Sequence, residues 1–172
     1  MKKKLLIAIL PVIICIIGVS VYNFCLTSNG DTIESRENIL NKAISSGNDW
    51  TIAKEIELDG YIISGAYSTD NKSTLAIFKP TGNSSYEFLT SINRNREDII
   101  IGGSVINGNW YDLIWFNGAK TEHAEITYTI NGEIQNTLWR DTKNMDIIYF
   151  ENPEKEYSIH AVYYDSNGNK YE

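Results

Sequence analysis

From about residue 51 onward, apolar and polar residues alternate with a period of two, and short turn sequences interrupt the alternation. Three of these turns are Asp59-Gly60, Asn107-Gly108 and Asn131-Gly132, and their residues accept the positive φ that two-residue hairpins require. The turn signals recur at intervals of about eight to twelve residues. This pattern predicts a mainly β (α+β) fold of about nine or ten antiparallel strands in a sandwich or curled sheet. An open barrel is an alternative arrangement of the same strands.

Before the strands, apolar residues recur at helical spacing and predict one short amphipathic helix from about Thr32 to Ser46. Asp31 or Thr32 can cap its first turn, and Glu34 stands where a capping box places an acidic residue. Gly47 can adopt the left-handed conformation that ends a helix. The apolar stripe consists of Ile33, Ile39, Leu40, Ala43 and Ile44.

Two of the predicted strands differ in their patterns. In the strand at 122–130, Ala124, Ile126, Tyr128 and Ile130 alternate with polar residues, which predicts one core face and one solvated face. The segment Trp110–Phe116 is apolar on both faces except at Asp112. A strand of this kind is covered on both sides, so we expect it at the centre of the fold, beneath the helix.

The first residues form a separate segment. Three lysines precede an apolar run from Leu5 to Tyr22, which continues less strictly to Leu26. As a helix, the longer segment would be about 33 Å long, enough to cross a hydrocarbon core of about 30 Å. Lysines before a span hold the N-terminus in the cytoplasm. We therefore expect residues 1–26 to be a membrane anchor that contacts the bilayer through residues 5–26, residues 27–31 to be a linker, and 32–172 an extracytoplasmic domain.

Two alternatives to an anchor remain open. Gly18-Val19-Ser20 resembles a signal-peptidase site, so the segment could be an uncleaved signal or be removed from a secreted protein. Lipid attachment at Cys15 or Cys25 is disfavoured because Ile14 and Phe24 precede them. No other cysteine is present, so the predicted domain contains no disulfide and no cysteine-ligated zinc.

The charge of the chain limits its partners. The net charge is −7 over 172 residues. Without Lys2, Lys3 and Lys4, twelve basic residues remain against 22 acidic residues, which leaves −10. A domain this acidic repels nucleic acid. We therefore expect no nucleic-acid partner, and we expect a membrane or cell-envelope protein or peptide instead.

No catalytic motif stands out in the sequence. The chain contains neither a G-x-S-x-G elbow nor a phosphate-binding loop nor an H-E-x-x-H zinc motif. Asp165, Asn167 and Asn169 match the start of a calcium loop, but Lys170 occupies the position that requires glycine. We therefore predict no catalytic residue, no cofactor and no metal.

Candidate contact residues are Tyr164, His123 and His160. Both histidines fall on polar faces of predicted strands, and if those strands pair, Glu125 could complete a weak metal site with them. Four tryptophans and eleven tyrosines fit either a β core or an exposed aromatic face that binds sugars, peptides or proteins. Our first hypothesis is a membrane-anchored, non-catalytic binding or accessory domain, such as an envelope sensor, an immunity-type protein or a complex subunit. The alternatives are a wall-acting hydrolase that uses carboxylates, a structural spacer and a secreted protein.

Overall fold

The computed structural model describes residues 29–46, 48–82, 84–95, 99–117, 121–142, 145–151 and 156–171. This part of the chain forms one helix and eleven strands, which confirms the mainly β prediction. The elements are α2 (Ile33–Ala43), β1 (Thr51–Leu58), β2 (Tyr61–Tyr67), β3 (Lys72–Gly82), β4 (Ser85–Asn95), β5 (Ile99–Ile106), β6 (Asn109–Phe116), β7 (His123–Ile130), β8 (Glu133–Asp141), β9 (Ile147–Glu151), β10 (Tyr157–Tyr164) and β11 (Lys170–Tyr171).

The strands form three antiparallel sheets. Sheet A has the order β1-β2-β3-β4, sheet B the order β5-β6-β9, and sheet C the order β11-β10-β7-β8. Sequence neighbours pair through the predicted hairpins, and Asp59, Asn107 and Asn131 each have a positive φ near 50° (50°, 49° and 52°) followed by a positive-φ glycine. The pairings of β9 with β6 and of β10 with β7 join segments that are distant in sequence.

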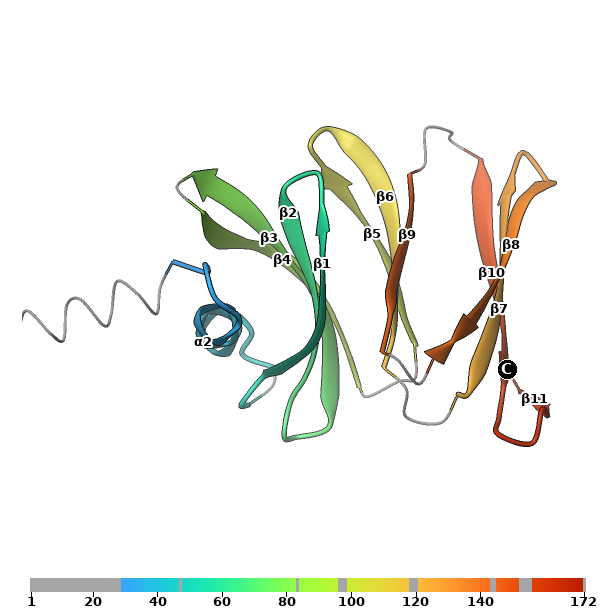
Figure 1. Ribbon diagram of the computed structural model, residues 1–172, viewed down its shortest axis with the longest axis horizontal. Coiled ribbons are helices and arrows are strands. Elements are labelled where there is room, and N and C mark those ends of the chain that lie inside the picture. Colours follow the sequence, from blue (N-terminus) through green and yellow to red (C-terminus); the bar gives the residue numbers. More distant parts are fainter. Residues whose placement is uncertain are drawn as a thin grey trace, which may run out of the picture.

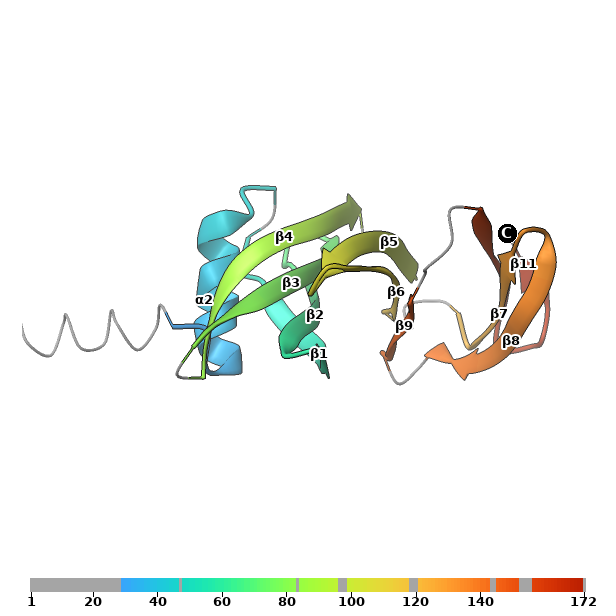
Figure 2. The same ribbon diagram turned by 90° about the horizontal axis from the view of Figure 1, so that it is seen from above.

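The sheets and the helix stack as four layers along the long axis of the molecule. Figure 1 shows α2 on the outer face of sheet A, then sheet B, then sheet C. The view from above in Figure 2 shows the same sequence of layers. One hydrophobic cluster lies between α2 and sheet A, a second between sheets A and B, and a third between sheets B and C. The predicted sandwich is therefore extended by a third sheet.

Strand β6 lies at the centre of the stack. Leu113 and Trp115 pack toward sheet A, whereas Ile114 and Phe116 pack toward sheet C, and all four are fully buried. The prediction of a doubly covered central strand is thus confirmed. Its expected place beneath the helix was wrong, because α2 packs on the far face of sheet A and sheets A and C supply the two covers.

Strand β7 has the predicted core face. Ala124, Ile126 and Tyr128 are buried, and Ile130 at the strand end is partly buried. They pack against sheet B because the alternation of side chains in a strand directs every second residue to the same side. The remaining residues of β7 consequently form part of the outer face of sheet C.

Helix α2 is shorter than predicted and begins after Thr32, whose hydroxyl accepts a hydrogen bond from the Ser35 backbone N–H. Ile44 is its C-cap, and Gly47, the predicted terminating residue, lies outside the described residues. The helix buries Leu40 fully and Ile44 almost fully against sheet A, in contact with the cluster that includes Phe78.

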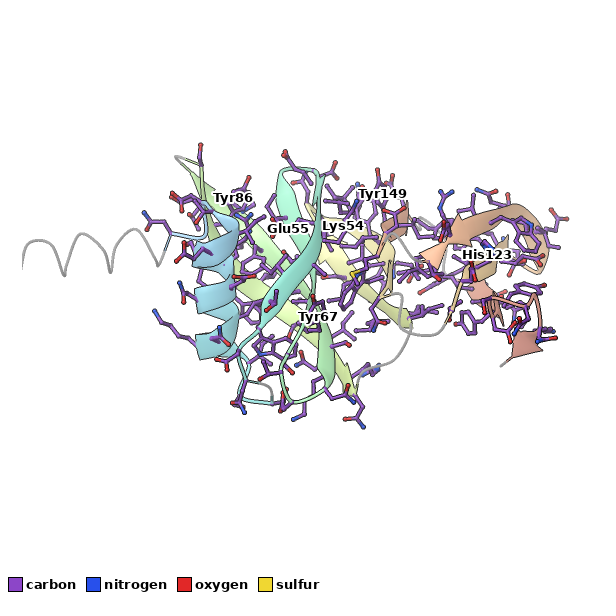
Figure 3. The ribbon with its side chains drawn as sticks, turned by 60° about the horizontal axis from the view of Figure 1, so that its bottom comes forward. Lys54, Glu55, Tyr67, Tyr86, His123 and Tyr149 are labelled. Carbon is purple, nitrogen blue, oxygen red and sulfur yellow. The ribbon has the colours of Figure 1, made fainter. Side chains whose placement is uncertain are left out.

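A partly buried ion pair joins α2 to sheet A. The Arg36 guanidinium donates to both carboxylate oxygens of Glu55 on β1, with Nε–Oε1 2.8 Å and Nη2–Oε2 2.6 Å. Arg36 also donates to the Gly30 carbonyl, and the Tyr86 N–H on β4 donates to the Asn29 carbonyl at 2.7 Å. Figure 3 shows Glu55 and Tyr86 at this end of the molecule. The start of the described chain is therefore bonded to the body on the α2 side.

The predicted membrane anchor, residues 1–26, and the first two residues of the predicted linker, residues 27–31, lie outside the described residues; Asn29, Gly30 and Asp31 of the linker are described. Within the described part of the chain, α2 is the single helix, and it does not have the length or apolarity needed to cross a bilayer.

We predict that Gly65→Ala destabilises the protein by about 1–3 kcal/mol, the usual cost of overpacking a core. A Cβ at Gly65 would overlap the rigid indole ring of Trp115, which is fully buried. Urea unfolding measures this loss. The matched control is Gly102→Ala, where the added Cβ meets the flexible end of Ile92. Equal stability of both variants and the native protein would contradict the close packing of sheets A and B.

Candidate functional site

The outer face of sheet C carries all three of the predicted contact residues. In the pairing of β7 with β10, His123 lies opposite Tyr164, and His160 lies opposite Thr127. Their side chains point away from sheet B because the residues between them supply the core. Figure 3 shows His123 at the end of the molecule remote from α2. The sequence-predicted residues thus share one face.

The two histidines are not neighbours on this face. The partner of His160 on β7 is Thr127, four residues along the strand from His123. Four residues of an extended strand span about 13 Å, which is too far for two ligands of one metal ion. In the described ranges, no group of three metal-ligating side chains converges. The strands β7 and β10 pair, as a metal site of His123, His160 and Glu125 would require, but their register keeps the two histidines apart.

The most prominent feature of the face is an aromatic pair above a carboxylate. The rings of Trp139 on β8 and Tyr164 on β10 are stacked, with centroids 5.4 Å apart and planes at 26°. Between their strands, Glu125 on β7 accepts a hydrogen bond from the Tyr164 hydroxyl at 3.3 Å. Partial burial, followed by the nearby Glu125 charge, raises the pKa of Tyr164. The hydroxyl therefore stays protonated at neutral pH and remains a donor.

The aromatic pair is accessible to a partner. Trp139 is 60% exposed and Ile134 on the same strand is 68% exposed, the two highest values for large hydrophobic side chains in the described residues. Both lie on the outer face, since they pair with Glu125 and Thr129 of β7. Sequence reasoning missed both. A register shift between Tyr128 and Thr129 places one extra β8 residue in the ladder, so Trp139 pairs with Glu125 rather than Ala124, whereas Ile134 lies on the turn side of the shift and pairs with Thr129 in the regular hairpin register. We call Ile134, Thr137, Trp139, Tyr164 and Glu125 the aromatic face.

A shallow hollow of about 360 Å³ lies near one end of sheet C, around the Asn131-Gly132 turn. Its lining includes Tyr157 and Ser158 at the start of β10. A second hollow of about 360 Å³ lies between the end of α2 and β4. Both are open depressions of the surface, so they fit an extended contact better than an enclosed small molecule.

A second group of polar side chains lies between sheets B and C. Asp112 on β6 is 4% exposed, and its Oδ1 accepts hydrogen bonds from Trp110 Nε1 at 3.3 Å and from the Tyr157 hydroxyl at 3.1 Å. Its Oδ2 has no hydrogen-bond partner among the described residues. Burial raises the pKa of this carboxyl, and the two hydrogen bonds offset only part of the effect.

Aromatic rings surround this carboxyl. Tyr128 stacks on Phe150 with centroids 4.8 Å apart and approaches Tyr157 at 6.2 Å. Burial and then the Asp112 charge raise the pKa of Tyr128. The Tyr128 hydroxyl is buried without a hydrogen-bond partner among the described residues. In the sequence, Asp112 stands out only as the one charged residue of an apolar strand. It is buried because sheet C packs over β6.

The segment that matches only the start of a calcium loop, from Asp165 to Asn169, forms a turn between β10 and β11. The Asp165 carboxylate accepts hydrogen bonds from the backbone N–H groups of Asn167 and Asn169, each at 2.8 Å, and from the Asn169 side chain at 3.0 Å. These bonds, the Asn169 side chain first, lower the pKa of Asp165. Its oxygens therefore serve to close the turn.

Comparison of the chain with protein families, with curated proteins and with solved structures finds no match.

We predict that the stability of the protein falls as pH rises through the raised pKa of Asp112, since a carboxyl with a raised folded-state pKa favours folding only while protonated. Asp112→Asn removes this dependence. The difference in free energy of unfolding, variant minus native, should therefore become more favourable to the variant from about pH 4, near the ordinary aspartate pKa of about 3.9, to about pH 7.

Asp165→Asn provides a control. The lowered pKa of Asp165 stabilises the fold above the unfolded value of about 3.9, so this difference should stay constant above about pH 4 and disappear only as pH falls further. Urea unfolding at several pH values measures both differences. A constant difference for Asp112→Asn across this range would contradict the burial of its carboxyl.

Proposed function

We propose that the protein is a membrane-anchored, extracytoplasmic, non-catalytic binding or accessory domain, and that the aromatic face is its contact surface. The observation that carries the proposal is the exposure of Trp139 and Ile134 on one outer sheet face, beside the Tyr164–Glu125 hydrogen bond. Exposed tryptophan and tyrosine are enriched where proteins bind partners. A partner from the cell envelope, either a protein or a peptide, fits an acidic body that repels nucleic acid.

The position of the aromatic face supports the proposed anchoring. The described chain begins on the α2 side, where Asn29 and Gly30 are bonded to the body, and sheet C lies at the opposite end of the stack (Figure 1). With residues 5–26 in a bilayer, the aromatic face would point away from the lipid. A receptor or accessory domain needs this orientation to meet a partner in the envelope.

A wall-acting hydrolase is the second candidate function, and the raised pKa of Asp112 favours it. Glycoside hydrolysis needs a second carboxylate about 5–9.5 Å from the first. Among the described residues, Asp112 is the single buried carboxylate, and its hydrogen-bond partners are Trp110 and Tyr157. We therefore place binding before hydrolysis.

We predict that Trp139→Ala removes the partner that co-purifies with the full-length protein from its own membranes. Hot-spot aromatics commonly contribute 2 kcal/mol or more, which is about a thirtyfold loss of affinity. The control is Tyr149→Ala, because Tyr149 is also an exposed aromatic (48%) but lies on sheet B. Identical co-purifying proteins for both variants would contradict the assignment of the face.

We predict that protease added to intact cells removes the domain while a cytosolic control survives. Intact-mass analysis of the same protein separates the anchor from the secreted alternative, because cleavage after Ser20 would remove the first twenty residues. Survival of the domain under conditions that digest a surface control would contradict the proposed location.

A further inference from the structure

Strand β8 is an unprotected edge of sheet C. It pairs with β7 on one side and ends the sheet on the other, so one row of its main-chain N–H and C=O groups faces outward. It contains nine residues, seven of them exposed, and no proline. Its central residues, from Gln135 to Trp139, carry no charge. Natural edge strands are usually shortened, charged or covered to prevent pairing with another chain.

The long edge strands of sheets A and B pack against more elements than β8 does. In sheet A, β1 also packs against α2 and β9, and β4 packs against α2 and β5. In sheet B, β5 also packs against β3 and β4. Strand β9 has five residues, and β11, with two, pairs with Tyr163 and Tyr164 at the end of β10. In the described chain, β8 has packing contacts of comparable extent with β7 alone.

The edge and the aromatic face are continuous. Ile134, Thr137 and Trp139 belong to β8 and also to the outer face of sheet C. A strand added beside β8 would therefore place every second side chain next to Ile134 and Trp139. The two observations, an open backbone edge and two highly exposed apolar side chains, involve the same strand.

The charge of sheet C indicates what kind of segment fits. Its described residues, 121–142 and 156–171, contain six carboxylates and two cationic side chains, Arg140 and Lys170. On the outer face, Glu125 and Asp141 flank the Trp139 position. A lysine or arginine of a partner strand would lie near these carboxylates and the Trp139 ring, which also attracts cations.

A second copy of this chain fits less well. If two β8 strands paired antiparallel over their full length, the twofold axis would pass through Thr137. Glu133 of each copy would then lie opposite Asp141 of the other, and like charges directly opposite each other destabilise a sheet. The acidic net charge of sheet C adds repulsion at longer range.

We propose that β8 binds an extended, basic segment of a partner protein by β-strand addition. The proposal rests on the proposed binding function and specifies its chemistry. Main-chain hydrogen bonds to the open edge supply the general affinity. The aromatic face selects a segment in which lysine or arginine alternates with small or β-branched residues.

The test uses the full-length protein in detergent and a ten-residue peptide in which lysine alternates with valine and threonine. Titration calorimetry measures binding of this peptide and of a version with glutamate in place of lysine. Two further peptides carry N-methyl groups at alternate residues, one set at odd and the other at even positions. In a strand, alternate N–H groups point to opposite sides, so one methylated set should lose affinity by about tenfold or more.

Variants of the protein complete the test. Thr137 is exposed on β8, so Thr137→Lys should weaken binding of the lysine peptide, whereas Thr137→Glu should maintain or strengthen it. Thr81→Lys, at an exposed position on β3, should leave binding unchanged. Circular dichroism establishes that each variant is folded.

One-to-one binding of the lysine peptide that is sensitive to methylation and to Thr137→Lys supports the proposal. Absence of binding, equal affinity for the glutamate peptide, or equal affinity for both methylated peptides overturns it. Self-association that Thr137→Lys abolishes also overturns it in favour of a second copy. If Trp139→Ala still removes the native partner while N-methylation of the peptide does not change its affinity, strand addition is wrong but the proposed binding function is retained.

Discussion

The double burial of sheet B is the constraint on which the rest of the structure depends. A sheet cannot cover its own two faces, and β6 in the three-stranded sheet B carries large apolar side chains on both of them, including Trp115 and Phe116. Each face therefore needs a cover, because exposed apolar area of this size costs free energy in water. Sheet A supplies one cover and sheet C the other.

This stacking gives the molecule two different ends. Sheet A uses its second face to bind α2, and the partly buried Arg36–Glu55 pair and the Asn29–Tyr86 hydrogen bond hold the first described residues there. Sheet C has no further layer in the described part of the chain, so its second face and the β8 edge meet solvent. The proposed contact surface is thus a consequence of the layer order: the last sheet of a stack has one face without a cover.

Local features of the structure could be read from the sequence, whereas long-range pairing could not. The turns at Asp59-Gly60 and Asn131-Gly132 fix where strands end, because few residues accept positive φ. The apolar pattern of Trp110–Phe116 correctly indicated two covers. It did not indicate which elements provide them, since the pairings of β6 with β9 and of β7 with β10 depend on contacts between distant segments. A third sheet was missed for this reason.

In the candidate site, too, local patterns could be read from the sequence and long-range register could not. The alternation in β7 placed His123 on an outer face, and pairing with β10 brought Tyr164 beside it. The position of His160 relative to His123 depended on a register that no local pattern encodes. Trp139 was missed as a contact residue because the extra residue in β8 changes which side chains share a face. The burial of Asp112 likewise follows from the packing of sheet C over β6.

Native-state hydrogen exchange tests the central claim most directly, since exchange of amides in a doubly covered strand requires large-scale opening of the fold. The account predicts the slowest exchange in Tyr111–Phe116 of β6 and much faster exchange along the outer edge of β8. Exchange in β6 as fast as in β8 would show that sheet B is not covered on both faces and would contradict the layer order.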